Sequence, residues 1–327
     1  MEISLQKIGT PSPSLSDKST DISKPQGTTV SVSVGSPEPQ EITDEKETAH
    51  IPEQVLTIFD KTVQKISARD NEPKYPLGIR PVDDLIFGFH EGQVCTIAAR
   101  PGEGKSAMMS QCMWNLARLN IPTLCISLEM SKEELTERIF CHEMKVDNQI
   151  LRRGKSKTVE KEMMDFSKII RDVPLYMVDG AGSRIEDIEK ILNYSKENKM
   201  EFKAIFLDYL QLMKSDGQKK RNYEIGEYLR RFRSLAKQRK FCLIVLSQIS
   251  RAAQDRVDRR PMLHELKDSG DIEQDSDTVL MLYWNANNEK REQDQNKYEV
   301  IIAKQRHGCI GKAQVKFRPE IYSFSEF

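Results

Sequence analysis

Residues 93–116 read QVCTIAARPGEGKSAMMSQCMWNL, a buried-type apolar run that passes through a glycine-containing loop into a helical pattern. The loop fits the phosphate-binding pattern Ala/Gly-x-x-x-x-Gly-Lys-Ser/Thr between Ala99 and Ser106. In such a loop, backbone N–H groups and the helix N-terminus surround phosphates. We expect Lys105 to contact the β- and γ-phosphates of ATP and to take part in catalysis, and we expect the Ser106 hydroxyl to bind Mg²⁺. The predicted nucleotide-binding residues are Ala99, Arg100, Pro101, Gly102, Glu103, Gly104, Lys105, Ser106 and Ala107.

Further short apolar runs follow this loop, and helical patterns separate the first five runs, counted from residues 93–98. Their continuous apolar character is typical of strands that are buried on both faces. The last three runs are joined by polar connectors, which indicates an antiparallel extension at one sheet edge. The sequence therefore predicts an α/β fold with a largely parallel sheet over residues 75–327. The expected strands are 93–98, 123–127, 175–178, 204–207, 241–247, 278–283, 298–303 and 313–317.

Two helix starts carry the Ser-x-x-Glu pattern of a capping box. One is Ser131 with Glu134, and the other is Ser183 with Glu186. A further amphipathic helix is expected over residues 223–239.

Acidic residues follow two of the expected strands. Asp208 ends the run AIFLD, where a P-loop protein needs an acid for its metal, although a strand-end aspartate can also serve only a turn. Glu129 stands after TLCIS and before Ser131, so we expect it to orient the attacking water. A helix-start acid that complements the helix dipole is the alternative for Glu129.

Three polar residues end later strands. Gln248 ends FCLIVLSQ and is a γ-phosphate sensor or, with equal weight, a plain polar strand end. Lys304 and Arg306 stand two residues apart at the end of EVIIAKQR, on one face of an extended chain. We expect this pair to neutralise transition-state charge on a γ-phosphate, and it could act across a subunit boundary.

A basic, glycine-containing stretch follows Gln248. It includes Arg251, Arg260, Lys267, Asp268 and Gly270. Such side chains suit phosphate contacts with single-stranded nucleic acid, whereas a solvated charged face is the simpler interpretation of a charge run. The whole chain has 50 basic and 50 acidic residues, so any nucleic-acid contact must be local.

Composition sets the remaining expectations. Residues 1–50 are rich in Ser, Thr, Pro and acidic residues and predict a disordered tail. Residues 51–74 hold an amphipathic helix, with Leu56, Phe59, Val63 and Ile66 on one stripe, and a connector. That stripe packs either on its own domain or on a neighbouring subunit. The six cysteines show no C-x-x-C pairing and no apolar run spans a bilayer, so we expect a reduced, cytoplasmic protein.

Six blocks in order resemble the C-terminal motor domain of the DnaB family of replicative helicases. They are AARPGEGKS, CISLEMS, IFLDYLQLM, VLSQISRA, RRPMLHELKDSGDIEQDSD and EVIIAKQRHG. The resemblance covers about residues 75–327, and the helix at 52–68 is similar to the family's linker helix. It implies a RecA-like fold and a ring, usually hexameric, that translocates on single-stranded DNA with ATP and Mg²⁺ to unwind forked duplex. It also implies the bacterial or phage-infected nucleoid as the location.

By motif match, the resemblance gives Glu129 the role of catalytic base and Gln248 that of γ-phosphate sensor. It makes Lys304 and Arg306 fingers for the neighbouring subunit's nucleotide. The positions Lys267, Asp268 and Gly270 match the segment that contacts the DNA backbone in the central channel.

The chain also departs from the family's pattern. We expect no folded N-terminal domain before the linker helix, which leaves a primase or helicase loader open as partners. Lys267 and Asp268 stand where the family commonly has Arg-Glu, so bidentate phosphate contact is lost. A RecA-like, DNA-stimulated ATPase that remodels DNA without unwinding it, and an assembly module that uses ATP as a clamp, are the competing hypotheses.

Overall fold

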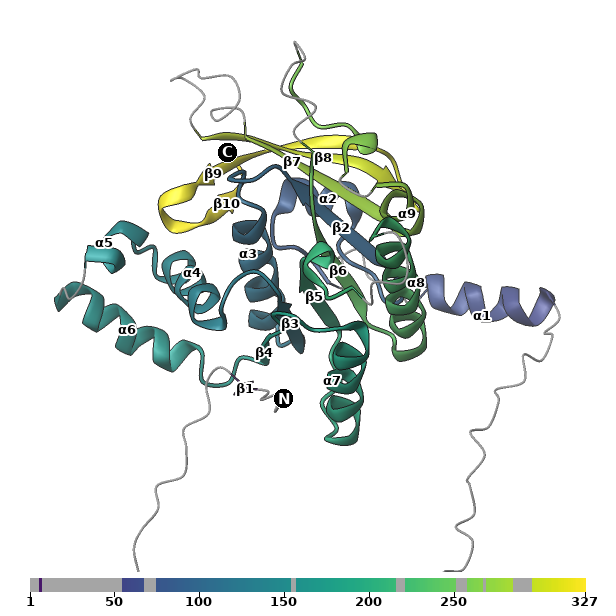
Figure 1. Ribbon diagram of the computed structural model, residues 1–327, viewed down its shortest axis with the longest axis horizontal. Helices are drawn as coiled ribbons and strands as arrows, with labels where there is room; N and C mark the ends of the chain where they lie inside the picture. The colour runs from purple at the N-terminus through teal and green to yellow at the C-terminus, as the bar shows by residue number, and fades with distance from the viewer. Residues whose placement is uncertain are drawn as a thin grey trace, which may run out of the picture. The chain divides into compact units, whose positions relative to one another are not determined.

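The computed structural model of the protein describes residues 6–7, 55–67, 75–153, 157–215, 221–250, 258–266, 269–284 and 296–327. The chain divides into two units, Pro11–Asn71 and a larger one formed by Met1–Thr10 with Glu72–Phe327. Within the smaller unit lies helix α1 (Val55–Ser67), the helix expected near residues 52–68 (Figure 1). The apolar side chains of Val55, Ile58, Phe59 and Val63 on α1 are exposed.

The larger unit is built on a sheet whose described strands have the order β1-β4-β3-β5-β6-β2-β7-β8-β9-β10. The six strands from β4 to β7 in that order are parallel to one another, and β8, β9 and β10 extend the sheet antiparallel at one edge. This confirms the expected α/β fold. The strands are β1 (Gln6–Lys7), β2 (Val94–Ala99), β3 (Thr123–Ser127), β4 (Leu175–Asp179), β5 (Ala204–Asp208), β6 (Cys242–Gln248), β7 (Thr278–Trp284), β8 (Lys297–Gln305), β9 (Gly311–Arg318) and β10 (Ser323–Ser325).

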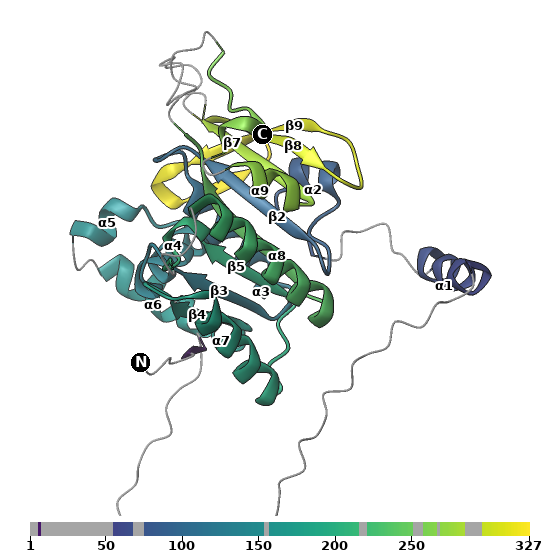
Figure 2. The same cartoon turned by 45° about the vertical axis from the view of Figure 1, so that its right-hand side comes forward.

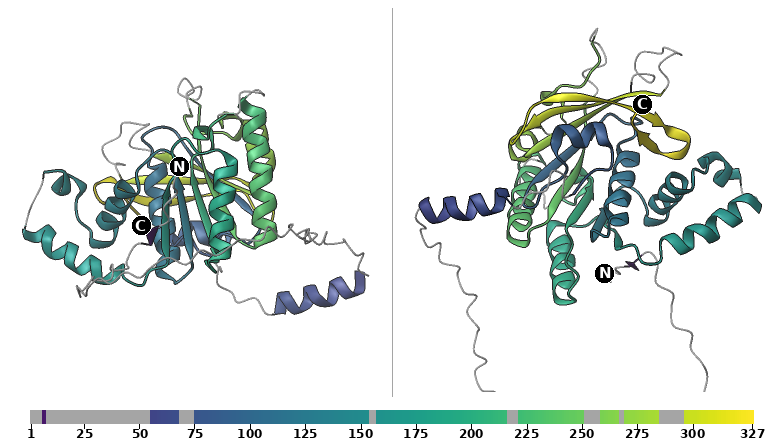
Figure 3. Two further views of the ribbon diagram at one scale, coloured as in Figure 1. Left: turned by 60° about the horizontal axis from the view of Figure 1, so that its bottom comes forward. Right: turned by 180° about the vertical axis from the view of Figure 1, so that it is seen from behind.

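The parallel strands bury both faces, because successive side chains alternate between two apolar clusters. On β2, Cys95 and Ile97 belong to one cluster, while Val94 and Ala98 belong to the other. The first cluster packs against α2 (Arg80–Ile86), α3 (Lys105–Arg118), α4 (Lys132–Met144) and α6 (Lys157–Ile169). The second packs against α7 (Ile185–Glu197), α8 (Arg221–Arg239) and α9 (Ser269–Asp275). The sheet therefore lies between two helix layers, of which α7 and α8 are seen from the front in Figure 2 and both layers in Figure 3.

Short elements complete the described fold. Helix α5 (Asn148–Arg153) follows α4, and 3₁₀ turns occur at η1 (Leu210–Leu212), η3 (Leu263–Glu265) and η5 (Pro319–Ile321). None of the described helices is long and apolar enough to cross a bilayer. Five of the cysteines are buried free thiols, and Cys309 is exposed.

One expected helix start is confirmed and the other is wrong by one residue. Ser131 caps α4, because its hydroxyl accepts from the Glu134 N–H at 3.2 Å while the Glu134 carboxylate accepts from the Ser131 N–H at 3.0 Å. Helix α7 instead begins after Arg184, whose N–H donates to the Asp187 carboxylate at 3.1 Å. The backbone N–H of Ser183 is taken by a turn to the Gly180 carbonyl, which displaces Ser183 from the cap position.

Strand β1 lies inside the stretch expected to be a disordered tail. Its residues Gln6 and Lys7 pair antiparallel with Met177 and Tyr176 of β4. The other residues of 1–50 lie outside the described part of the chain.

Candidate active site

A pocket of about 570 Å³ opens at the carboxyl ends of the parallel strands, where ligands bind in open α/β sheets. Strand β2 leads into the phosphate-binding loop, and β6 ends beside it with Gln248 paired to Ala99. Glu129 follows β3 and also lines the pocket. The lining residues are Ala99, Arg100, Pro101, Gly102, Gly104, Lys105, Ser106, Ala107, Glu129, Met130, Glu134, Arg138, Gln248, Trp284, Phe317, Pro319 and Tyr322.

Two glycines let the loop take its shape. Gly102 and Gly104 have φ angles of 79° and 82°, in the left-handed region that favours glycine. Gly104 is also packed closely, since a Cβ there would lie 3.2 Å from Cζ of Phe317. Helix α3 starts at the next residue, so its unpaired N-terminal N–H groups face the loop.

The Lys105 ammonium lies between two carboxylates. Its Nζ is 3.4 Å from Asp208 Oδ1 and 3.7 Å from Glu129 Oε2. The same nitrogen stands 4.0 Å from the centre of the Tyr209 ring. The structure thus brings together three of the predicted site residues, which come from separate strand ends.

Asp208 fits the part of a magnesium ligand. It is fully buried, and neither carboxylate oxygen has a partner with hydrogen-bond geometry among the described residues. Burial raises the pKa of the Asp208 carboxyl, and the nearby Lys105 ammonium and Ser106 hydroxyl oppose that rise. A buried carboxylate without hydrogen bonds is costly unless a cation accompanies it. Carboxylate and hydroxyl oxygens are ligands that Mg²⁺ accepts, and Ser106 and Asp208 supply both.

Gln248 stands at the base of the segment that follows β6. Directly after it, Ile249 forms an antiparallel bridge with Leu266, and the Ser250 N–H donates to the Glu265 carbonyl at 2.9 Å. This bridge brings the two ends of the intervening basic segment together beside the pocket. Gln248 is therefore directly next to the Ile249–Leu266 bridge that closes the base of the segment.

Glu103 differs from the other predicted loop residues. Its side chain is buried and does not line the pocket. It faces Arg100, with Nη1 and Oε1 3.9 Å apart, while Arg100 Nη2 donates to the Arg259 carbonyl at 2.6 Å. The loop is thus tied to Arg259, which lies within the basic segment.

Several lining residues at one end of the pocket carry no signal in the sequence. Trp284, Phe317 and Tyr322 come from β7, β9 and the turn before β10. The Trp284 and Phe317 rings meet edge to face at 5.2 Å, and Arg138 of α4 stands over the Tyr322 ring at 5.0 Å. These residues reach the pocket only through the register of the antiparallel edge, which local sequence patterns do not encode.

Lys304 and Arg306 lie near the amino ends of the parallel strands β2 and β7, whereas the phosphate-binding loop follows the carboxyl end of β2. Lys304 pairs with Val279, which pairs with Thr96 in the first half of β2. Arg306 lies beyond, and its N–H donates to the Asp277 carbonyl at 2.9 Å. At about 3.3 Å per residue, the loop after Ala99 is roughly 15 Å further along β2. The pair therefore lies at the other end of β2 from its own chain's pocket.

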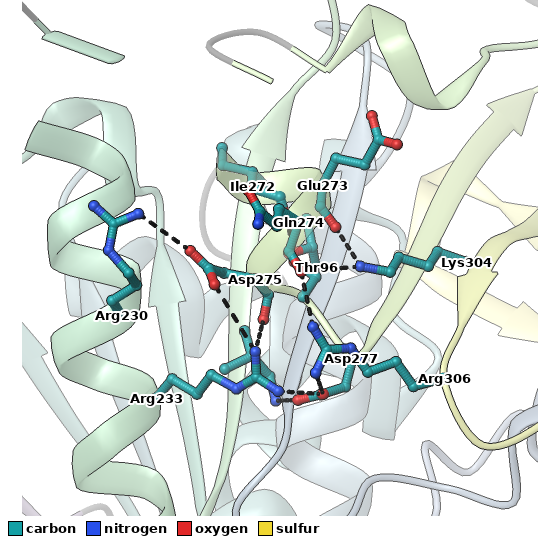
Figure 4. Close-up of polar contacts among 12 residues, drawn as sticks. Thr96, Arg230, Arg233, Ile272, Glu273, Gln274, Asp275, Asp277, Lys304 and Arg306 are labelled. Atoms are coloured by element: carbon teal, nitrogen blue, oxygen red, sulfur yellow. Dashed lines mark hydrogen bonds and ion pairs between the residues drawn. The ribbon is translucent and has the colours of Figure 1, made fainter. Parts of the chain in front are cut away.

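The two cations do lie side by side, as their spacing predicts. Lys304 Nζ and Arg306 Nη2 both donate to the Gln274 carbonyl at the end of α9, at 3.1 Å and 2.9 Å (Figure 4). Lys304 also donates to the Glu273 carbonyl. Partial burial lowers the pKa of Lys304, and the neighbouring Arg306 charge lowers it further.

The predicted DNA contacts are only partly described. Arg251, Lys267 and Asp268 lie outside the described residues, and Gly270 is in the first turn of α9. Arg260 holds the buried Glu299 carboxylate with two nitrogens, Nε at 2.7 Å and Nη2 at 2.6 Å. That pairing raises the pKa of the Arg260 guanidinium.

A phosphate-binding loop on a strand-to-helix turn, with acids after adjacent parallel strands, defines the class of P-loop ATPases with a RecA-like core. Within that class, the sequence matches the DnaB-like helicase C-terminal domain family over residues 75–326. The chain belongs to this family.

Relatives and solved structures agree. The chain is 34% identical over 273 residues to a replicative DNA helicase DnaB of Geobacillus stearothermophilus, covering 80% of this chain and 59% of the relative. It is 32% identical to the replicative DNA helicase DnaC of Bacillus subtilis, covering 84% and 61%. The chain thus spans about three fifths of these relatives' lengths.

Two solved structures share the fold. One is a separate ATPase domain, which has a TM-score of 0.78 at 27% identity, covering 85% of this chain and all of that one. The other is the structure of a DnaB-like replicative helicase and its interactions with primase, which has a TM-score of 0.77 at 27% identity, covering 84% and 68%.

Proposed function

We propose that the protein is the motor of a ring-shaped replicative DNA helicase that hydrolyses ATP at the boundaries between its subunits. One observation carries the proposal: the pocket lies at the carboxyl ends of the parallel strands, and the Lys304/Arg306 pair lies near their amino ends. A chain with this arrangement offers its cations to another chain's nucleotide. Such a head-to-tail contact closes into a ring when the rotation between subunits closes.

Within one subunit, the loop and the start of α3 bind the phosphates through backbone N–H groups. Lys105 then exchanges its carboxylate neighbours for phosphate oxygens. Mg²⁺, held by Ser106 and Asp208, would supply further positive charge at the β- and γ-phosphates. Glu129, half exposed at the pocket, accepts a proton from the attacking water and orients it.

Lys304 and Arg306 of the adjacent subunit complete the site by stabilising charge on the γ-phosphoryl group. The neighbouring subunit also offers a cover for Phe59 and Val63, the stripe residues of α1 whose side chains are exposed. Of the two alternatives for that helix, we therefore favour packing on a neighbour.

DNA contact is assigned to the segment between Gln248 and α9. Loss of the γ-phosphate would alter the hydrogen bonds of Gln248, next to the Ile249–Leu266 bridge at the base of this segment. The expected DNA contacts Arg251, Lys267, Asp268 and Gly270 fall within it or at its end. Arg260, the fifth expected contact, is held by Glu299 and by Asp258, whose Oδ1 accepts from its Nη1 at 3.3 Å.

A strand-displacement assay on a forked DNA duplex tests this function. We expect displacement that requires ATP and Mg²⁺ and is lost in Glu129→Gln. DNA-stimulated hydrolysis with no displacement would instead favour an ATPase that remodels DNA. ATP binding with no turnover would favour an assembly module.

A further inference from the structure

We propose that Asp277 is a positioning residue for the trans-acting Arg306, which it anchors to the interior of the sheet and to α8. This inference rests on the proposed role of Arg306 at a neighbouring subunit's nucleotide. Asp277 stands in the stretch DSDT, directly before β7.

The Asp277 carboxylate is buried and fixed from several sides. Its Oδ2 accepts from the Val94 N–H at 2.9 Å, and its Oδ1 accepts from Arg233 Nη2 of α8 at 2.8 Å (Figure 4). Its own N–H donates to the Val94 carbonyl at 2.8 Å. A carboxylate held by the start of β2 and by α8 has little freedom to move.

Arg306 contacts Asp277 twice, once at the backbone and once at the fixed carboxylate. Its backbone N–H donates to the Asp277 carbonyl at 2.9 Å, and its Nη1 lies 3.4 Å from Asp277 Oδ1. A third contact is with the Gln274 carbonyl at the end of α9, to which Nη2 donates. A cation is favoured at a helix C-terminus because the carbonyl dipoles converge there.

These contacts leave Arg306 able to act. Its side chain remains 38% exposed. Arg306 directly follows the last residue of β8 and is not part of the β7–β8 register. A guanidinium has five N–H donors, and the Asp277 and Gln274 contacts leave others for phosphate oxygens. Since arginine loses substantial rotamer entropy when it is ordered, an arginine that is aimed in advance avoids part of this cost during reaction.

Asp277→Asn is the direct test, because asparagine keeps the shape and removes the charge that faces Arg306. In the purified ring-forming protein, we expect kcat for ATP to fall about 10- to 100-fold, as for a misplaced catalytic group. KM for ATP should stay near the wild-type value, because the variant's own pocket lies at the carboxyl ends of the strands, away from Asp277. A merely structural role would not separate kcat from KM in this way.

Mixing experiments assign the defect to one side of the subunit boundary. Asp277→Asn mixed with Glu129→Gln should regain activity, because some boundaries then join an intact pocket to an intact Arg306. Asp277→Asn mixed with Arg306→Ala should gain nothing, because both are defective on the same side. The double variant Asp277→Asn/Arg306→Ala should be no slower than Arg306→Ala alone.

Asp275→Asn is the matched control. It is the same substitution two residues away, and the Asp275 carboxylate pairs with Arg230 and Arg233, 3.6 Å and 3.9 Å away. We expect its kcat to stay within about twofold of wild type, as for a partly exposed ion pair.

Thermal unfolding shows whether Asp277→Asn folds. If it does not, Arg233→Lys replaces it, because lysine cannot bridge the Asp277 carboxylate and the Asp275 carbonyl as Arg233 does. Arg233→Lys should lower kcat less than Asp277→Asn does, and mixing it with Glu129→Gln should restore part of the activity.

Unchanged kcat in folded Asp277→Asn, or in Arg233→Lys where that variant replaces it, would overturn the inference. The inference would also be overturned if mixing with Glu129→Gln restored activity to Arg306→Ala but not to Asp277→Asn. Failure to relieve Arg306→Ala itself would overturn the proposed function, and the inference with it.

Discussion

The two ends of the central sheet differ in how they hold positive charge. At the pocket edge, Lys105 is almost enclosed and lies between Glu129 and the buried Asp208. At the opposite edge, Lys304 and Arg306 face backbone carbonyls of α9, and Arg306 has Asp277 as its acidic neighbour. At the pocket, one lysine therefore lies beside two carboxylates, whereas at the other ends of the strands two cations lie near one carboxylate.

This difference is the reason for proposing that one subunit makes half a site. An incoming triphosphate adds negative charge to a pocket whose lysine already lies beside two carboxylates. In the proposed function, Mg²⁺ at Ser106 and Asp208 would offset part of that charge, and cations from a neighbouring subunit would offset more. Substitutions in the pocket should therefore slow ATP hydrolysis in the same subunit, and substitutions at Lys304 or Arg306 should slow it in the neighbouring subunit.

The largest effect is expected from Arg306→Ala. We predict a kcat loss of about 10³- to 10⁵-fold, because the transition-state charge loses its finger. Binding of a fluorescent ATP analogue should be unchanged, because the pocket is intact. A loss of only a few-fold would mean that the two edges do not cooperate in catalysis.

Glu129→Gln acts at the other edge and should lower kcat by about 10²- to 10⁴-fold through loss of the base. ATP affinity should be equal or higher, because Lys105 loses an acidic competitor. Glu134→Gln is the control: Glu134 lines the same pocket but caps α4, a role that glutamine also fills. Equal losses in both variants would remove the special role of Glu129.

The apolar residues of α1 test whether neighbouring subunits are held together, because Arg306 can act on another subunit's nucleotide only in an assembled ring. Phe59→Asp should raise the protein concentration needed for ring assembly about 30-fold, since about 2 kcal/mol of apolar burial is lost. Analytical ultracentrifugation measures this. Gln64→Asp, on a different side of α1, should assemble normally. Normal assembly of Phe59→Asp would place the stripe elsewhere.

Gln248→Ala should have the smallest effect. We expect unstimulated ATP hydrolysis to change little and stimulation by single-stranded DNA to fall about tenfold, a typical coupling between sites. ATPase rates with and without DNA provide the test. Full stimulation would leave Gln248 as a plain strand end.

Local sequence patterns predict most of the pocket. The loop at Ala99–Ser106 is contiguous, and Asp208 and Glu129 each end a recognisable apolar run, so parallel strands bring them to one edge. The pattern at Ser183 predicts a cap one residue too early, because Asp187 rather than Glu186 returns to the helix start. Patterns of hydrophobicity locate elements better than their ends.

Long-range contacts lie beyond such patterns. Asp277 meets Val94 from 183 positions away and Arg233 from 44 positions away, and only the sheet order brings them together. The rings of Trp284 and Phe317 reach the pocket through antiparallel register for the same reason. Strand β10 is three residues long and offers too few positions to show a period.

The most direct measurement is ATP turnover by equal mixtures of Arg306→Ala and Glu129→Gln proteins. In randomly mixed rings, about a quarter of the head-to-tail boundaries join an intact pocket to an intact finger. The account predicts that the mixture regains up to about that share of wild-type turnover, while each variant alone stays inactive. A mixture that has exchanged subunits and stays as inactive as its components would contradict a site shared between subunits.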